Sequence, residues 1–267
     1  MIELVLVGAG TGHPDHLTLQ GVRALQEADL VIIPRKGAGK EDLVHLRRAM
    51  LARHRLEGAV VEVDLPVREG NLPYLEGVER WHDAIARVWE AAARSALPEG
   101  GTVAMLVWGD PSLYDSSLRI AARLNWRARV VPGITAIQAL CAAHAIPLNS
   151  LGNEVRITTG RRLREGGFPT DCDRVVVMLD GDPAFQTLAP EGLWIWWGAY
   201  LGMGEEMLDQ GPLAEAGARI VAARARARAA HGWIMDCYLL ARTGQAPGVH
   251  SPCTERTPTT HGPLSRR

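Results

Sequence analysis

The residues best suited to chemistry form a corner at positions 108–111 (WGDP), directly after the apolar run 102–107. Such a run is typical of a strand buried on both faces of a parallel sheet. Gly109 can adopt backbone angles closed to other residues and lets a ligand approach the chain. Pro111 stiffens the turn and restricts Asp110 to extended conformations. Because ligands in open α/β sheets bind beyond the carboxyl ends of strands, the corner is a candidate binding site.

A second candidate is the glycine-rich run 8–12 (GAGTG), which follows the apolar run at the start of the chain. Its third glycine comes one residue early for a dinucleotide-binding G-x-G-x-x-G motif. The second predicted strand ends at Pro34, without the acidic residue that would bind a ribose hydroxyl. The following helix is expected to begin at Thr18, too far on for phosphate to meet its N-terminus. These features argue against a dinucleotide-dependent oxidoreductase, which remains the alternative from another enzyme class.

Three further groups of residues carry weaker signals. His13 and His16 could pair on a metal, but no Cys or carboxylate cluster completes a site, so we predict no metal. Arg161 and Arg162 follow a predicted strand, where guanidinium groups could bind carboxylates. The alternating arginines of residues 224–228 are most simply a solvated helix face. No Gly-x-Ser-x-Gly motif is present, which removes one common hydrolase signature.

Composition favours a globular protein of one or two units. The chain has 267 residues, of which 47% are hydrophobic and 22% are charged, with a formal net charge of −1. This balance gives no case for nucleic acid or an anionic membrane as partner. The four cysteines are far apart, so we expect reduced thiols. With no signal-peptide pattern and no apolar run of membrane-spanning length, we expect a cytoplasmic protein.

Apolar periodicity predicts alternating strands and helices. In the first half we predict strands at 2–7, 30–33, 60–65, 102–107 and 128–131, with helices at 19–28, 41–54, 77–97, 115–124 and 135–144. In the second half we predict strands at 155–159, 174–179, 193–197, 219–221 and 233–240, with helices near 183–189, 204–216 and 222–230. This alternation predicts an α/β fold in both halves. We expect domains at 1–146 and 147–242, followed by a disordered tail at 243–267.

Taken in order, the motifs resemble the tetrapyrrole (corrin/porphyrin) methylase family. The matching segments are 7–12 (VGAGTG), 17–21 (LTLQG), 28–31 (ADLV), 109–111 (GDP) with Tyr114, 131–136 (VPGITA) and 175–179 (VVVML). Within the family, the chain is most similar to members that methylate C1 of precorrin-5 and expel acetate. That similarity lies in Trp108, 36–44 (KGAGKEDLV), 157–162 (ITTGRR), 178–182 (MLDGD), 197–202 (WGAYLG) and 231–236 (HGWIMD). The resemblance covers about residues 3–242.

The resemblance implies two α/β domains of the class III methyltransferase type, with S-adenosylmethionine in the cleft between them. It implies cofactor contacts from Thr11, Trp108, Gly109, Asp110, Leu113, Thr135, Ala136, Met178, Leu179, Gly198 and Ala199. Two positions depart from the family pattern. Many members have Pro where this chain has Thr11, and uroporphyrinogen methylases have an acid where it has Pro34. That acid serves in proton transfer, so its absence implies a different substrate.

Methyl transfer to a macrocycle carbon mainly requires alignment and exclusion of water. Loss of acetate also requires water to add to a carbonyl, so a general base or an oxyanion donor would help. Tyr114 is our first candidate, followed by Lys36 and Asp15, because each lies at a predicted strand end. The substrate's carboxylates are expected to meet basic residues, namely Arg35, Lys36, Lys40, Arg161 and Arg162.

The alternatives within this fold are precorrin methylases that act at C20, C17 or C11, and more distantly diphthine synthases or ribosomal-RNA methylases. RNA binding predicts a basic surface, and the net charge of −1 weighs against it. The resemblance implies a homodimer.

Overall fold

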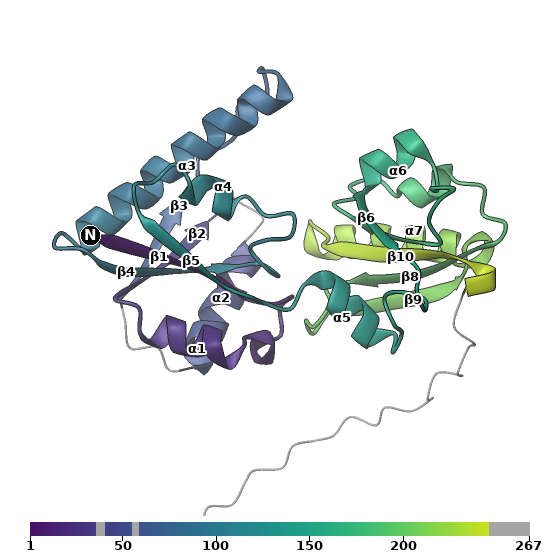
Figure 1. Ribbon diagram of the computed structural model, residues 1–267, viewed down its shortest axis with the longest axis horizontal. Helices are drawn as coiled ribbons and strands as arrows, with labels where there is room; N and C mark the ends of the chain where they lie inside the picture. Colours follow the sequence, from purple (N-terminus) through teal and green to yellow (C-terminus); the bar gives the residue numbers. More distant parts are fainter. Residues whose placement is uncertain (36–40, 55–58, 246–267) are drawn as a thin grey trace, which may run out of the picture.

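The computed structural model describes residues 1–35, 41–54 and 59–245, which form two five-stranded sheets in two lobes (Figure 1). The first sheet has the order β3-β2-β4-β1-β5, and all its strand pairs are parallel. Its strands are β1 (Ile2–Gly8), β2 (Leu30–Arg35), β3 (Ala59–Asp64), β4 (Gly101–Val107) and β5 (Arg127–Val131). Both faces of β1 and β4 are buried, as the continuous apolar runs predicted.

Helices cover both faces of this first sheet. The helices α1 (Leu19–Gln26) and α2 (Glu41–Arg53) pack on one face, and α3 (Tyr74–Ala96) and α4 (Ser117–Ala121) pack on the other. The chain therefore leaves β1 and β2 toward one face but leaves β4 toward the opposite face. Since β4 lies between β1 and β2, the connections diverge on both sides of its carboxyl end. Crevices that bind ligands form at such points of divergence.

The second sheet has the order β6-β7-β10-β8-β9, and only β6 and β7 run parallel. Its strands are β6 (Val155–Thr159), β7 (Arg174–Met178), β8 (Leu193–Ala199), β9 (Met207–Pro212) and β10 (Asp236–Arg242). One face carries α6 (Gly160–Gly166), the short helix η2 (Ala184–Thr187) and α7 (Leu213–His231). The other face is covered by α5 (Ala136–Ala143), whose Ile137 and Leu140 pack against β7, β8 and β10.

Most predicted elements are present, but three predictions are wrong. Residues 219–221 are part of α7 rather than a strand, because Leu213, Ala216, Ile220 and Ala223 form a buried stripe at helical spacing. Residues 207–212, predicted as helix, form β9, so the second sheet is mixed. The strand β2 continues two residues past its predicted end at Ile33. Pro34 pairs with β3 alone, because the pairing between β2 and β4 ends at Ile32.

Two helix starts agree with the sequence. The Thr18 hydroxyl accepts a hydrogen bond from the Gly21 amide at 3.0 Å, and Thr135 caps α5 in the same way. The helix α5 precedes the predicted domain boundary at 146/147 but packs on the second sheet. That boundary stays a prediction. Of the predicted tail, Thr243–Gln245 forms a short 3-10 helix and residues 246–267 lie outside the described residues. None of the described helices combines the length and apolar character needed to cross a bilayer.

Candidate functional site

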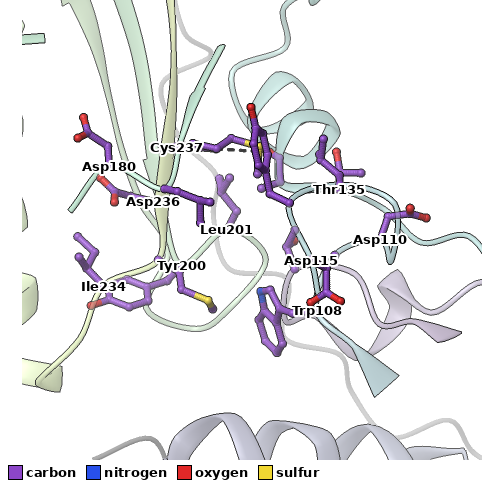
Figure 2. Close-up of a pocket in the computed structure, with 18 of the residues that line it drawn as sticks. Trp108, Asp110, Asp115, Thr135, Asp180, Tyr200, Leu201, Ile234, Asp236 and Cys237 are labelled. Atoms are coloured by element: carbon purple, nitrogen blue, oxygen red, sulfur yellow. Dashed lines mark hydrogen bonds between the residues drawn. The ribbon is translucent and has the colours of Figure 1, made fainter. Parts of the chain in front are cut away.

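A cavity of about 460 Å³ lies between the two sheets, at the carboxyl ends of β1, β4 and β5 (Figure 2). The first half of the chain lines it with Thr11, Trp108, Gly109, Asp110, Leu113, Tyr114, Asp115, Thr135 and Ala136. The second half lines it with Met178, Leu179, Asp180, Gly181, Tyr200, Leu201, Met203, Arg228, Ile234, Met235, Asp236 and Cys237. Most of these side chains are apolar, and aspartates lie on both walls.

The three strand-end loops of the first sheet are packed together at glycines. Gly109 donates to the Gly10 carbonyl at 2.8 Å and accepts from the Gly10 amide at 3.2 Å. A Cβ on Gly133 would lie 2.3 Å from the Gly109 carbonyl oxygen and 2.7 Å from the Cα of Gly8. The glycine-rich run therefore serves close packing of the loops. The amide and carbonyl of Gly109 are already paired, so Gly109 contributes space to the cavity.

Asp110 joins two of these loops. Its Oδ1 accepts from the Ser112 amide at 2.8 Å and from the Ser112 hydroxyl at 2.5 Å, and its Oδ2 accepts from the Gly133 amide at 2.8 Å. Burial favours the neutral acid, but the hydrogen bonds from Ser112 and Gly133 outweigh it and hold the pKa of Asp110 below its ordinary value. Asp110 is an ionised structural group at neutral pH.

Strained backbone is concentrated around the cavity. Among the described residues, four that are not glycine have positive φ, and three of them line the cavity: Tyr114 at 51°, Leu179 at 52° and Tyr200 at 50°. Bulky residues rarely adopt this conformation, which costs free energy that the surrounding structure must supply. Such strain is typical of functional sites. Tyr114 as a residue is 42% exposed, and its partial burial raises the pKa of the phenol.

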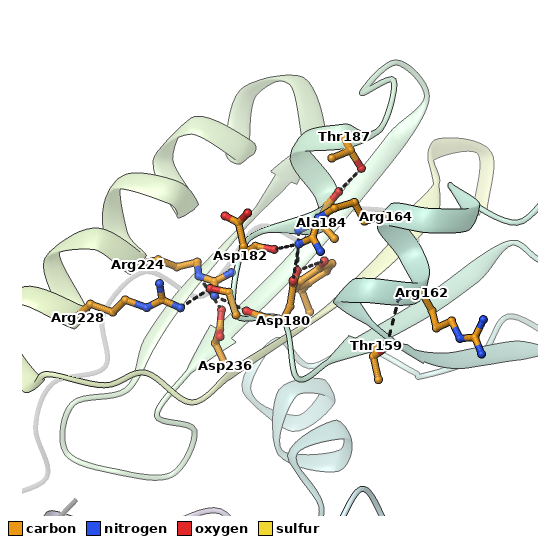
Figure 3. A network of polar contacts seen from close by, with 12 residues as sticks. Thr159, Arg162, Arg164, Asp180, Asp182, Ala184, Thr187, Arg224, Arg228 and Asp236 are labelled. Carbon is orange, nitrogen blue, oxygen red and sulfur yellow. Dashed lines mark hydrogen bonds and ion pairs between the residues drawn. The ribbon is translucent and has the colours of Figure 1, made fainter. Parts of the chain in front are cut away.

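The second wall contains a buried network of charged groups (Figure 3). Asp236, at the start of β10, accepts from the Trp197 indole at 2.7 Å and lies 3.3 Å from Nε of Arg224. Arg224 also donates to the Asp180 carbonyl at 2.6 Å, and Asp180 Oδ2 accepts from the Tyr238 hydroxyl at 2.7 Å. Burial raises the pKa of Asp236, although Arg224 and Trp197 oppose the shift. These contacts fix the strand-end loops of β7 and β10.

This network corrects, for Arg224, the prediction that the arginine run of 224–228 is simply a solvated helix face. Arg224 is only 3% exposed, whereas Arg226 and Arg228 are exposed as predicted. Arg228 also donates to the Gly181 carbonyl and lines the cavity. The importance of Asp180 and Asp236 was also missed. The sequence signal was present, because both lie in segments that carried the family resemblance.

Most of the predicted cofactor residues are brought together by the fold. Nine of the eleven lie on the cavity wall, together with Tyr114: Thr11, Trp108, Gly109, Asp110, Leu113, Thr135, Ala136, Met178 and Leu179. Gly198 and Ala199 are not among the lining residues. Gly198 is packed against Leu201 and Leu140, and Ala199 is fully buried, so Tyr200 and Leu201 take their place on the wall.

The predicted polar residues lie elsewhere. Asp15 is exposed and lies 3.4 Å from Arg53, and Arg35 is paired with Asp64 at 2.6 Å. Arg161 and Arg162 are exposed at the start of α6, outside the lining of the cavity. The predictions for Lys36 and Lys40 fall outside the described residues.

The first loop also meets the second half of the chain directly. A Cβ on Gly12 would lie 2.5 Å from Cγ of Met203, and a Cβ on Gly202 would lie 2.6 Å from Cε1 of His16. His16 Nδ1 is 3.1 Å from the Thr11 hydroxyl, so this ring supports the contact between the loops. Within the described residues no group of three or more His, Cys, Asp or Glu side chains is placed to hold a metal ion.

Comparison with known proteins agrees with this arrangement. Residues 3–217 match the family model "Tetrapyrrole (Corrin/Porphyrin) Methylases". The chain is 48% identical over 250 residues to the precorrin-6A synthase [deacetylating] of Sinorhizobium sp, covering 90% of this chain and 95% of that protein.

Solved structures give the same picture. A cobalamin-synthesis-related protein (CobF) from Corynebacterium diphtheriae is 38% identical with a TM-score of 0.79, covering 91% of this chain and 100% of that one. The uroporphyrin-III C-methyl transferase of Thermus thermophilus, complexed with S-adenyl homocysteine, shares the fold at 21% identity and a TM-score of 0.58, covering 91% and 98%. This chain therefore belongs to the tetrapyrrole (corrin/porphyrin) methylase family.

Proposed function

We propose that this protein is an S-adenosylmethionine-dependent C-methyltransferase of corrin-ring biosynthesis. Its reaction is methylation at C1 of precorrin-5 with release of acetate, which gives precorrin-6A. The observation that carries this proposal is the similarity to the Sinorhizobium precorrin-6A synthase, which extends over 90% of the chain and hence over both walls of the cavity.

The residues of the cavity fit the methyl donor. S-adenosylmethionine combines an apolar adenine and thioether region with a sulfonium, an ammonium and a carboxylate, so its net charge is positive. The wall is mostly apolar, and its acidic residues Asp110, Asp115, Asp180 and Asp236 outnumber the one lining cation, Arg228, in the described part of the chain. An apolar cavity with a few placed polar groups is typical of a cofactor site. Bound there, the cofactor supplies an electrophilic methyl group.

In this proposal the protein acts on methyl transfer by positioning. The loops at Gly109, Thr135 and Leu179 hold the donor, and the two sheets enclose the reacting groups away from water. Direct contacts from Thr11, Trp108, Asp110, Leu113, Ala136 and Met178 belong to the same proposal. No strong base is required for the methylation itself, in agreement with Pro34 at the end of β2.

Release of acetate calls for a polar group beside the reacting carbonyl. Of the three catalytic candidates, Tyr114 lines the cavity, Asp15 does not, and Lys36 lies outside the described residues. Because burial raises the pKa of Tyr114, its phenol stays protonated at neutral pH. We assign Tyr114 the role of hydrogen-bond donor to the oxyanion that forms when water adds to the acetyl carbonyl.

The test is to incubate the protein with S-adenosylmethionine and precorrin-5 and to follow the products by mass spectrometry. The proposal expects one added methyl group per substrate together with free acetate. Methyl gain without acetate would replace this assignment with another precorrin C-methyltransferase, acting at C20, C17 or C11. Absence of cofactor binding in calorimetry would refute the cofactor assignment.

The Tyr114→Phe variant tests the oxyanion role. Loss of one oxyanion donor is expected to lower the rate of acetate release by about 10²–10³-fold while leaving cofactor affinity unchanged. An unchanged rate of acetate release would rule Tyr114 out.

The proposal includes two further expectations: the protein forms a homodimer and is located in the cytoplasm. Light scattering of the purified protein tests the first, because a monomer at micromolar concentration would contradict it. Fractionation of the producing cells tests the second.

A further inference from the structure

A second cavity, of about 270 Å³, lies on the other side of Trp108 and Tyr114 from the first. It forms because β2 pairs with β4 only from Leu30 to Ile32. Beyond that point β2 pairs only with β3, and β4 pairs only with β1. The two strands separate at their carboxyl ends, which is the second of the two points where the connections around β4 diverge.

The second cavity adjoins the first. Four residues line both of them: Trp108, Tyr114, Asp115 and Met235. Its other walls are largely apolar, with Trp81 and Trp89 from α3 and Met105 and Val107 from β4. A ligand that extends past these shared residues would contact both cavities.

Arg47 is the one cation among the described residues that line this second cavity. Its Nε donates to the Leu106 carbonyl at 3.3 Å and its Nη1 donates to the Leu43 carbonyl at 3.2 Å. The centre of the guanidinium lies 5.9 Å from the centroid of the Trp108 ring, on the wall shared by both cavities. A guanidinium has five N–H donors, of which these bonds use two. No carboxylate of residues 1–35, 43–54 and 59–245 lies within ion-pair distance of Arg47.

The charge of Arg47 persists although its surroundings disfavour it. Burial lowers the pKa of Arg47 to about 10, with a smaller opposing effect from Asp115. The guanidinium is therefore cationic at neutral pH, and Asp115 is the carboxylate of the described side chains that acts on it, without direct ion pairing. A desolvated cation binds a carboxylate strongly, because its desolvation has already occurred in the free protein.

We propose that Arg47 and the second cavity form a subsite for one carboxylate side chain of the tetrapyrrole. This subsite, which rests on the proposed function, anchors the macrocycle at its edge. Trp108 then separates the anchored edge from the methyl donor in the first cavity. The carboxylate arm fixes which ring carbon faces the donor, so Arg47 acts as a specificity-determining residue.

The test compares Arg47→Met and Arg47→Lys with Arg48→Met as matched control. Arg48 is the next residue on α2, is exposed and pairs with Glu62, so its loss removes the same charge from the same helix. We expect Arg47→Met to raise KM for precorrin-5 by about 10- to 100-fold, as for loss of a hydrogen-bonded charge. Arg47→Lys should recover part of this loss, and Arg48→Met should match the wild type.

The affinity for S-adenosylhomocysteine, measured by calorimetry, distinguishes a loss of substrate binding in Arg47→Met from a general structural defect. The subsite predicts unchanged affinity in Arg47→Met, because the donor lies in the other cavity. Unchanged KM in Arg47→Met would overturn the proposal. So would a parallel loss of S-adenosylhomocysteine affinity and thermal stability, since Arg47 would then serve only to satisfy the Leu106 carbonyl.

Direct binding keeps this test independent of the proposed reaction. If the wild type does not turn over precorrin-5, the proposed function fails, and uroporphyrin, which carries eight carboxylates, is used as probe with tryptophan fluorescence as readout. Weaker quenching in Arg47→Met than in Arg48→Met supports the subsite. Equal quenching in the two variants, or none in the wild type, overturns it.

Discussion

Asp110 stabilises the corner that closes one end of the first cavity, because its carboxylate accepts three hydrogen bonds from Ser112 and Gly133. An Asn side chain has one acceptor oxygen, so Asp110→Asn leaves at least one of these donors without its acceptor. We expect the variant to lose about 1–3 kcal/mol of unfolding free energy at neutral pH. Urea denaturation measures this loss.

The difference in unfolding free energy between the wild type and Asp110→Asn depends on pH. Since the pKa of Asp110 is lower in the folded protein than its ordinary value of 3.8, the unfolded chain binds the proton more readily. The stability contributed by the carboxylate is therefore complete above pH 3.8 and is lost as the pH falls through the lower folded pKa. The stability gap between wild type and Asp110→Asn should narrow below pH 4. A stability difference that stays constant with pH would show that the charge of Asp110 does not contribute to it.

Gly109 is the residue through which the cavity can be blocked selectively. Its φ is +66°, and a Cβ would meet only the Cα of Thr135, at 3.9 Å. Gly109→Leu therefore costs about 1–2 kcal/mol of backbone strain and places its side chain in the cavity. We expect calorimetry to detect no S-adenosylhomocysteine binding, while circular dichroism shows an intact fold.

Gly192→Leu is the matched control for this variant. Gly192 has a φ of +71°, no atoms near its Cβ position, and a place before β8, away from the cavity. It carries the same backbone strain without the obstruction, so its cofactor affinity should equal that of the wild type. Unchanged affinity in Gly109→Leu would refute the location of the cofactor.

At the scale of elements, the ends of β1, β4 and β5 form one packed unit. Gly133→Ala would bring a methyl group against the Gly109 carbonyl and the Cα of Gly8, which are backbone atoms and cannot move independently. We expect a loss of about 1–3 kcal/mol in urea denaturation. Gly166→Ala, at an exposed helix end with open space around it, should change stability little. Equal stability of the two variants would contradict close packing at the strand ends.

How far the sequence predicts these elements depends on whether local pattern or tertiary contact determines them. The strands β1 and β4 and the cap at Thr18 follow from apolar runs and local hydrogen bonding, and they were predicted. The strand β9 was missed because its apolar side chains, Met207 and Leu208, are adjacent and show no strand alternation, and its identity depends on pairing with β8. Arg224 looked exposed because its partner Asp236 lies on a separate element, β10.

The candidate site shows the same division. Residues in glycine and proline corners were found because the corner itself is a local signal, and nine of eleven cofactor candidates line the cavity. Basic residues could not be sorted by type alone. Arg35 is paired with Asp64, whereas Arg47, which no motif marked, donates to the Leu106 carbonyl and lines the second cavity. Only the fold separates these two arginines.

At the scale of the whole molecule, the two sheets meet at the cavity and at the contact of Gly12 with Met203. A ligand held by both walls binds only when both sheets are folded, so its binding free energy adds to the stability of the pair. At 100 times its Kd, S-adenosylhomocysteine should add about 2.7 kcal/mol. For a chain of this size, that corresponds to a rise in Tm of about 5–10 °C.

Calorimetric unfolding tests whether this stabilisation reaches both sheets. If the sheets unfold separately without ligand, saturating S-adenosylhomocysteine should raise both transitions and bring them together, because neither wall alone retains the site. A rise confined to one transition would assign the binding site to one sheet and contradict a cavity shared by both. The transition temperatures of Gly109→Leu should not rise under the same conditions. Its obstructed cavity does not bind S-adenosylhomocysteine, so the ligand cannot stabilise the folded state.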